Sequence, residues 1–154
     1  MSDPVEFVTD HEPWNAVDGL EATCRAAIVK AIARMESVRE GTAVILFTCD
    51  GTVRALNAQY RSKDRPTNVL AFPAPESEGY PGDIALAYET CLEEAEAAGI
   101  ALLDRAAHLA LHGFLHLNGY THEDEDDAAA MEALETEALS EIGIADPYLS
   151  PVRE

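Results

Sequence analysis

The amino-acid sequence predicts an α+β fold, in which a small mixed sheet of about four strands packs with about five helices in a single domain. Segments with strand character fall mainly before residue 90, and segments with helical periodicity dominate the remainder of the chain. A chain of 154 residues is the size of one typical domain and has no room for a second hydrophobic core. We therefore expect one domain over residues 1–154.

Four segments are expected to form the strands: residues 5–10, 42–50, 69–73 and 83–89. The first alternates apolar and polar side chains, and the second is a β-branched and aromatic run that closes at Asp50-Gly51, a turn-forming pair. The third ends at Pro73, where a segment with three prolines and two glycines, residues 73–82, indicates an exposed connection. The fourth strand follows this connection directly.

Five segments show helical signals: residues 15–35, 52–61, 89–98, 101–118 and 125–142. The first has apolar residues at helical spacing, with arginine and lysine on the other side. The last three end at Gly99, Gly119 and Gly143, and glycine is the usual residue for a left-handed stop after a helix. Residues 61–68 are charged and contain a proline, so we expect a loop that leads into the third strand.

The composition excludes several classes of protein. Hydrophobic residues make up 47% and charged residues 25% of the chain, and no window approaches the apolar stretch of about eighteen residues that a membrane span needs. The start of the sequence, MSDPVEFVTD, lacks the basic and apolar regions of a secretory signal, so we expect a cytoplasmic protein with no membrane partner. Cys24, Cys49 and Cys91 are far apart and are expected to be reduced thiols, not disulfides or metal ligands.

The formal net charge of -19 argues against generic binding of nucleic acids, because a large negative field repels phosphate backbones. The charges are unevenly distributed. Residues 123–137 hold eight acidic residues and no basic one, and we interpret this run as a solvated helix face. Four of the ten basic residues form one local patch: Arg54, Arg61, Lys63 and Arg65.

Three histidines on and after the expected helix at residues 101–118 have the spacing of a metal site. His112 and His116 are four residues apart, so two ring nitrogens on one helix face can reach one ion at about 2.0 to 2.1 Å. Gly119 can reverse the chain after the helix and return His122 to the same ion. Three protein ligands leave one tetrahedral position open, which is typical of a catalytic site, and three imidazoles favour zinc as the cofactor, one Zn²⁺ per chain.

His108 lies on the same stripe of the helix as His112 and His116. At about 1.5 Å per residue it is about 12 Å along the helix axis from His116, which is too far to bind the same ion. We expect His108 either to contact a metal ligand and fix its orientation or to contact the substrate. The alternative is an ordinary hydrogen-bonded core histidine.

The pattern H-x-x-x-H-x-x-G-x-x-H has the spacing found in metzincin metalloproteases, so the expected fold includes a metzincin-like metal-binding helix. The residue after the first histidine is glutamate in those enzymes and Gly113 here, so the general base for peptide hydrolysis is missing. Because glycine inside a helix costs about 1 kcal/mol relative to alanine, Gly113 suggests that the space beside the metal is needed for a bulky group. A metzincin-like metallopeptidase stays an alternative on spacing alone.

Four segments carry a family resemblance: HGFLHLNGYTH at residues 112–122, LNAQYRSKDRPTNVLAFP at 56–73, GDIAL at 82–86 and MEALETEALSEIGIADPY at 131–148. The first is similar to the signature H-G-x-L-H-L-x-G-Y-D-H of the YbeY family of bacterial endoribonucleases, also called rRNA maturation factors. The others resemble that family's Y-R-x-K-D, G-D-I and M-E-x-x-E segments in the same order. Thr121 and Asn68 stand at positions where the family has aspartate. Neither change removes a metal ligand. Thr121 is expected to lie next to the ligands and to affect metal affinity or the basicity of the bound water.

The resemblance implies a zinc-dependent, single-strand-specific endoribonuclease that acts in 3′-end maturation of 16S ribosomal RNA and in ribosome quality control. It implies catalytic roles for Arg61, His112 and His116. It also implies RNA contacts from Arg61, Lys63 and Arg65. Without the resemblance, Arg61 would be interpreted as a surface arginine paired with Asp64.

The implied partners are single-stranded ribosomal RNA and the small ribosomal subunit, with ribosomal proteins and an assembly GTPase as further candidates. One alternative belongs to a different class of function. The protein could be a non-catalytic ribosome assembly factor whose metal is structural and whose acidic face docks on basic ribosomal proteins.

Overall fold

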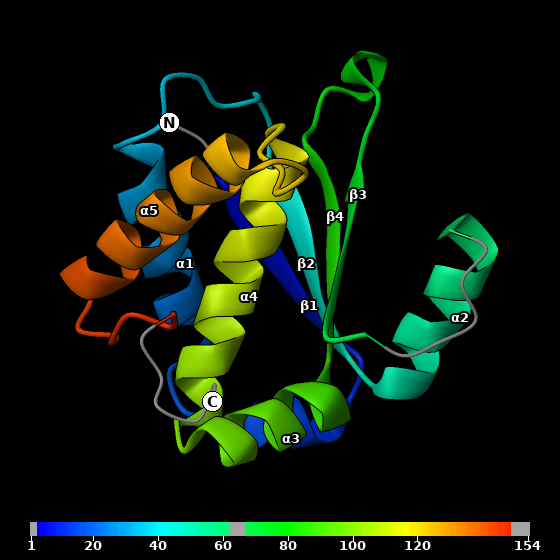
Figure 1. Cartoon of the computed structure of the whole chain (residues 1–154). Coiled ribbons are helices and arrows are strands. Elements are labelled where there is room, and N and C mark those ends of the chain that lie inside the picture. The colour runs from blue at the N-terminus through cyan, green and yellow to red at the C-terminus, as the bar shows by residue number, and fades with distance from the viewer. Residues whose placement is uncertain (1–2, 62–66, 149–154) are drawn as a thin grey trace.

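The computed structural model describes residues 3–61 and 67–148, except for the side chain of residue 61. In these ranges a four-stranded mixed sheet is packed with five α-helices, which confirms the predicted α+β fold (Figure 1). The strands are β1 (Val5–Thr9), β2 (Ala43–Thr48), β3 (Val69–Pro73) and β4 (Gly82–Ala87), in the spatial order β1-β2-β4-β3. β1, β2 and β4 run parallel, and β3 is antiparallel to β4 at the edge of the sheet.

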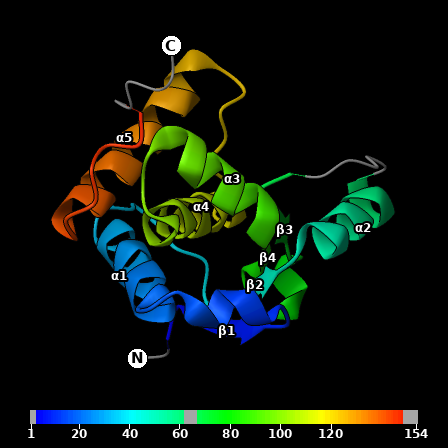
Figure 2. The ribbon, with the colours of Figure 1, turned by 90° about the horizontal axis from the view of Figure 1, so that it is seen from below.

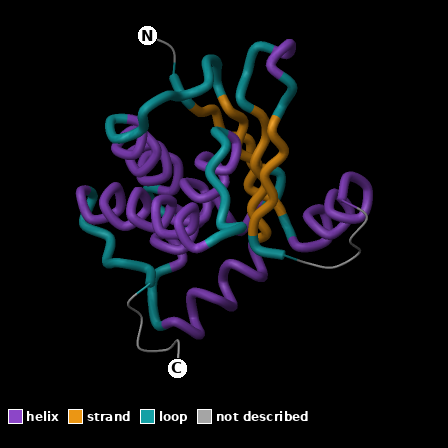
Figure 3. Tube along the Cα trace, turned by 45° about the horizontal axis from the view of Figure 1, so that its top comes forward, coloured by secondary structure: helices purple, strands orange, loops and turns teal. Residues whose placement is uncertain are grey.

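The helices are α1 (Leu20–Ile32), α2 (Asp50–Arg61), α3 (Tyr88–Ala98), α4 (Leu102–Leu117) and α5 (Glu125–Glu141), together with the 3-10 helices η1 (Glu12–Ala16) and η2 (Glu76–Glu78). Seen from below, α4 is enclosed by α1, α3 and α5, whereas α2 stands apart from this group (Figure 2). The sheet separates α2 from α1, α4 and α5 (Figure 3), whereas the start of α2 contacts the first turn of α3.

The main hydrophobic core lies between one face of the sheet and the helices α1, α4 and α5. Trp14, Phe47 and Phe114 are the largest of its fully buried side chains. α4 is buried on most of its surface, as its apolar sequence predicts. A smaller cluster under α2 covers part of the opposite sheet face: Val53, Leu70, Ala85 and Ala87.

Gly113 explains how closely α4 approaches the sheet. A Cβ atom on this residue would lie 2.8 Å from Ile84 Cγ2, on β4. Gly113 does leave room for a bulky group, as expected, but the group is the core side chain of Ile84 and not one that belongs to the metal site. Ile84 already fills the space, and glycine permits the close packing of helix on strand.

The helix expected over residues 15–35 is shorter in the structure. Gly19 has a φ of 75°, in the left-handed region, and it separates η1 from α1, which ends at Ile32. η1 turns Trp14 inward, where its indole Nε1 donates a hydrogen bond to Thr48 O at 2.8 Å. Burial of Trp14 in the core therefore overrides the helical spacing of the apolar residues.

The pair Asp50-Gly51 does not form the expected turn, because α2 begins at Asp50. The Asp50 carboxylate accepts hydrogen bonds from Thr90 N at 2.9 Å and from Thr90 Oγ1 at 2.7 Å, so it caps the first turn of α3. The left-handed helix ends at Gly99, Gly119 and Gly143 are confirmed, with φ values of 69°, 94° and 82°.

The predicted state of the cysteines is confirmed, since all three are free thiols, with Cys24 and Cys91 buried and Cys49 partly exposed. None of the helices in the described part of the chain combines the length and the apolar character that a membrane crossing needs.

Candidate metal centre

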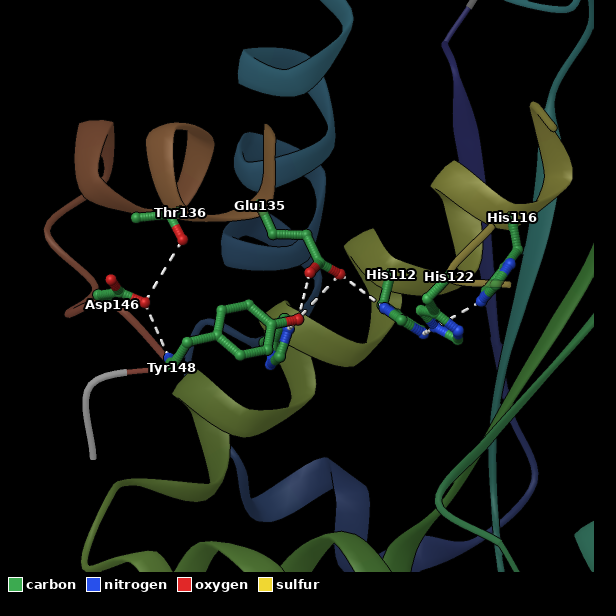
Figure 4. A network of polar contacts seen from close by, with 8 residues as sticks. His112, His116, His122, Glu135, Thr136, Asp146 and Tyr148 are labelled. Atoms are coloured by element: carbon green, nitrogen blue, oxygen red, sulfur yellow. Dashed lines mark hydrogen bonds and ion pairs between the residues drawn. The ribbon is translucent and has the colours of Figure 1, made fainter. Parts of the chain in front are cut away.

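The C-terminal half of α4 and the chain reversal after it carry the three predicted ligands. His112 and His116 lie about one turn apart on α4. Gly119 has a φ of 94°, and Tyr120 N donates back into the last turn of the helix at 3.1 Å, which completes a left-handed stop. The reversal brings His122 against the other two rings (Figure 4).

The distances between the three rings fit one metal ion. His112 Nε2 lies 3.1 Å from His116 Nε2 and 3.2 Å from His122 Nε2, and the three ligand atoms all lie within 4.8 Å of one another. Tetrahedral ligands at about 2.0 to 2.1 Å from a zinc ion are separated from one another by about 3.3 to 3.4 Å.

The three atoms that converge are all imidazole Nε2 nitrogens, and this also favours a bound cation. If the rings were held by hydrogen bonds alone, His112 Nε2 would have to serve both His116 and His122, although it offers only one N–H group or one lone pair. A metal ion at the meeting point instead satisfies one lone pair from each ring.

The rings differ in their exposure to solvent. His122 is exposed, whereas the side chain of His112 is 18% exposed. Burial, with the neighbouring rings of His112 and His122, lowers the pKa of His116 to about 4. His116 is therefore neutral at pH 7 and offers a lone pair, and the centre is open on the side of His122.

Glu135 of α5 is a site residue that the sequence pattern did not reveal. Its side chain is fully buried, and its Oε2 lies 2.6 Å from His112 Nδ1. The Tyr148 hydroxyl donates a hydrogen bond to Oε1 of the same carboxylate. Burial alone would raise the pKa of Glu135, but the hydrogen bonds with His108 and His112 lower it to about 2, so the carboxylate is ionised at pH 7.

The position of Glu135 within α5 could have indicated this role. The other buried residues of the helix are Met131, Ala138 and Leu139, so Glu135 stands on the stripe that faces the core. An acidic residue at a core position needs a partner. The interpretation of residues 123–137 as a solvated face is therefore wrong for Glu135, the one fully buried acid of that run.

His108 lies behind His112 and not on the side of the other two ligands. Its side chain is 8% exposed, and its Nε2 lies 3.5 Å from Glu135 Oε2 and 3.3 Å from the Tyr148 hydroxyl. Its Nδ1 is buried and has no hydrogen-bond partner among the described residues. The structure thus places His108 against the carboxylate that contacts a ligand.

The two departures from the family pattern make side-chain contacts with acidic residues. Thr121 Oγ1 contacts Asp127 Oδ2 at 3.4 Å, in the first turn of α5. Asn68 Nδ2 donates to Glu94 Oε1 at 3.0 Å, beside the start of β3. The expected effect of Thr121 on the ligands stays a prediction.

Of the basic residues that were expected to hold RNA, the structure describes only the backbone of Arg61. Arg61 is the last residue of α2, which packs on the opposite face of the sheet from α4 (Figure 1). The side chain of Arg61 lies outside the described residues, as do Lys63 and Arg65. Their predicted roles stay predictions.

An apolar groove of about 480 Å³ lies between α2 and the open face of the sheet. Tyr60 of α2 borders it, is 63% exposed, and meets Phe72 edge-on with 5.6 Å between the ring centroids. In the sequence, Tyr60 directly precedes the basic segment that begins at Arg61. The remaining apolar wall of the groove includes Val8, Val44, Leu46 and Leu56.

Comparisons with known proteins identify the family of this chain and a solved structure with a similar fold. The model of the family described as "Endoribonuclease YbeY" matches residues 11–143. A protein of that name from Chelativorans sp. (strain BNC1) is 43% identical over 150 residues, which cover 94% of this chain and 92% of that protein. Another, from Erythrobacter litoralis (strain HTCC2594), is 46% identical over 161 residues, which cover 94% of this chain and 96% of that protein. The solution structure of TM1509 from Thermotoga maritima has a similar fold, with a TM-score of 0.56 at 22% identity over 97% of this chain and 95% of that one.

Proposed function

The chain belongs to the YbeY family of endoribonucleases, and on that premise we propose that it is a zinc-dependent enzyme that cleaves single-stranded RNA. Its biological role is 3′-end maturation of 16S ribosomal RNA and ribosome quality control, in the cytoplasm. The observation that carries the metal part of the proposal is the convergence of His112, His116 and His122, because three imidazoles with one open side are the ligand set of a catalytic zinc ion.

The chain's own groups prepare the place where RNA reacts. When bound, zinc supplies a Lewis acid that polarises a phosphoryl oxygen and lowers the pKa of water. His112, His116 and His122 fix the reacting position at the end of α4, and Glu135 holds His112 from behind. Because His122 is exposed, a strand of RNA can reach this position from solvent.

The metallopeptidase alternative loses support from two contacts. Gly113 packs against Ile84, so a glutamate at that position would collide with β4. Glu135 cannot serve as the missing base, because its carboxylate contacts Nδ1 of His112, on the far side of the ring from the meeting point of the three Nε2 atoms.

Recognition of the RNA strand is assigned to α2 and the segment after it. The planar guanidinium of Arg61 suits phosphate oxygens, and Lys63 and Arg65 add positive charge along the backbone. The exposed ring of Tyr60 offers a surface on which an unpaired base can stack. An unpaired base is available only in a single strand, which supports the proposed preference.

The net charge of -19 supports a protein that works with partners, since a chain of this charge repels the phosphate backbone of RNA at long range. The proposed partner is the small ribosomal subunit, where basic ribosomal proteins complement the acidic surface. An assembly GTPase is a further proposed partner.

The test compares cells that lack the protein with cells complemented by the wild-type chain, Arg61→Ala or His116→Ala. We expect unprocessed 3′ ends of small-subunit ribosomal RNA in the absence of the protein, and failure of both variants to restore mature ends. His11→Ala, which alters a histidine paired with Glu89 and not with the trio, is the matched control and should restore them. Mature 3′ ends in cells without the protein would contradict the proposal.

The same experiment separates the second candidate function. The exposed acidic residues that open α5, Glu125 to Asp127, favour a docking role on a basic ribosomal protein. If Arg61→Ala restores mature ends and His116→Ala does not, the protein acts as a non-catalytic assembly factor whose metal is structural.

A further inference from the structure

A chain of polar contacts runs from His112 into the interior of the molecule and ends on the segment after α5 (Figure 4). Its central member is Glu135, which is fully buried and lies 23 residues after His112 in the sequence. Neither charge on the surface nor contact with RNA accounts for an acid in this place. A buried carboxylate is unfavourable unless it is well paired, so its partners indicate its purpose.

The first partner of Glu135, His112, is held by this contact in one tautomer. A neutral imidazole carries one N–H group, and an ionised carboxylate can only accept a hydrogen bond. With Glu135 Oε2 at 2.6 Å from His112 Nδ1, the proton must lie on Nδ1. The lone pair of His112 is then on Nε2, which faces His116 and His122 at 3.1 and 3.2 Å.

The remaining partners hold the carboxylate itself. The Tyr148 hydroxyl donates to Oε1, and His108 Nε2 lies 3.5 Å from Oε2. Tyr148 is held in turn, because its backbone N–H donates to Asp146 Oδ1 at 2.8 Å. The rings of Tyr148 and His108 also pack edge-on, with 5.5 Å between their centroids. The segment after α5 therefore restrains the rotamer of Glu135.

From this geometry we propose that Glu135 and Tyr148 are positioning residues for the metal: Glu135 selects the tautomer and the ring orientation in which His112 binds the ion, and Tyr148 holds Glu135 in place. The inference rests on the metal centre of the proposed function, and it assigns part of the affinity for the ion to α5 and the segment after it. Carboxylates behind metal-bound histidines are known to have such effects, because they orient the ring and increase its basicity.

The test measures zinc affinity in the full-length chain and not RNA cleavage. The variants are Glu135→Gln, which removes the charge at constant shape, and Tyr148→Phe, which removes only the hydroxyl. Glu132→Gln, the same change about one turn earlier on α5, is the matched control. Each protein is titrated with zinc against a chromophoric chelator at one pH, and the thermal midpoint of its metal-free form is recorded.

We expect Glu135→Gln to weaken zinc binding by about 10- to 100-fold. Tyr148→Phe should weaken it by a smaller factor, because Glu135 is still present, and Glu132→Gln should stay within about two-fold of the wild type. Nitrogen NMR of the metal-free wild type should show His112 protonated on Nδ1. In Glu135→Gln the amide can also donate to Nδ1, so the other tautomer should be populated.

Zinc affinity of Glu135→Gln within about two-fold of the wild type, with the tautomer of His112 unchanged, would overturn the inference. If Glu135→Gln does not fold, Tyr148→Phe decides, since its ring still packs on His108, and unchanged zinc affinity in that variant overturns the inference. A loss of thermal midpoint without a loss of zinc affinity likewise shows a structural role only. A wild type that binds no zinc would overturn the proposed function as well, so the two failures are distinguishable.

Discussion

Gly113 stands where α4 crosses β4, and a Cβ atom there would lie 2.8 Å from Ile84 Cγ2. Ile84 is fully buried and branched at Cβ, so it cannot move aside easily. We expect Gly113→Ala to lower the free energy of unfolding by about 1 to 2 kcal/mol, because overpacking outweighs the gain of about 1 kcal/mol in helix propensity. Urea unfolding of the metal-free protein measures this change.

A double-mutant cycle identifies the cause of the Gly113 effect. In an Ile84→Ala background the contacting methyl is gone, so Gly113→Ala should be neutral or stabilising there. An equal destabilisation in both backgrounds would show that Ile84 is not the reason for the glycine.

The three cysteines should differ strongly in reactivity. The hydrogen bond with Thr52 lowers the pKa of Cys49, whereas burial raises the pKa of Cys24 and Cys91 to about 12. A lower pKa gives more of the reactive thiolate at neutral pH. Brief alkylation of the folded protein, followed by peptide mass spectrometry, should therefore label Cys49 first. Labelling in urea should reach all three cysteines alike, and equal labelling in the folded state would contradict the assignment.

At the scale of single elements, the helix that carries Glu135, α5, is stabilised by a cap at its first residues. Asp124 is the N-cap of this helix, and its Oδ1 accepts a hydrogen bond from Asp127 N at 2.8 Å. Asp124→Ala should lower the free energy of unfolding by about 1 kcal/mol, the usual effect of losing such a cap. Chemical unfolding measures it, with the exposed neighbour Asp126→Ala as control. A loss as large in Asp126→Ala would mean that general charge near the helix start is responsible.

The elements themselves were largely predictable, because their signals are local. Apolar spacing and the glycines at 99, 119 and 143 place the last three helices to within about a residue or two. The predicted first helix is longer than α1, because the apolar spacing continues from Trp14 and Val17 past Gly19, whereas the helical backbone begins only after Gly19. Trp14 is inserted into the core, where its indole N–H donates to Thr48 O, and Thr48 is 34 positions away in the sequence. No local pattern contains that information.

At the scale of the whole molecule, zinc is expected to stabilise the fold without being required for it. The core between the sheet and the helices α1, α4 and α5 is extensive and contains none of the three ligands. Removal of zinc by a chelator should lower the thermal midpoint by about 5 to 10 °C, if the ion is present at about 100 times its dissociation constant. Calorimetry before and after chelation measures the shift, which His116→Ala should abolish and His11→Ala should retain. Unfolding at room temperature on chelation would show a structural metal.

The basic residues that are expected to contact RNA should be visible in the salt dependence of binding. The affinity of the protein for a short single strand should fall steeply with salt, and Lys63→Ala should reduce the slope of log affinity against log salt by about 0.7. Lys30→Ala is the control, since Lys30 lies on α1 near Glu141 at 3.9 Å. Equal slopes for Lys63→Ala and the wild type would remove Lys63 from the RNA contacts.

The predictability of the site follows the same division between local and distant information. His112, His116 and His122 were predictable because helix spacing and one glycine bring them together within eleven residues. Glu135 was not, because its contact with His112 needs the packing of α5 on α4, and its acidic neighbours suggested a solvated surface. A carboxylate on the core stripe of a helix is the pattern that would have revealed it.

The order of synthesis adds a consequence to the contact between Tyr148 and Glu135. Translation delivers the three imidazoles first, the carboxylate next and the tyrosine hydroxyl last. A chain that stops before Glu135 therefore has all three rings but neither of the groups that, on the inference above, align them, so the centre can be complete only after Tyr148 has been added.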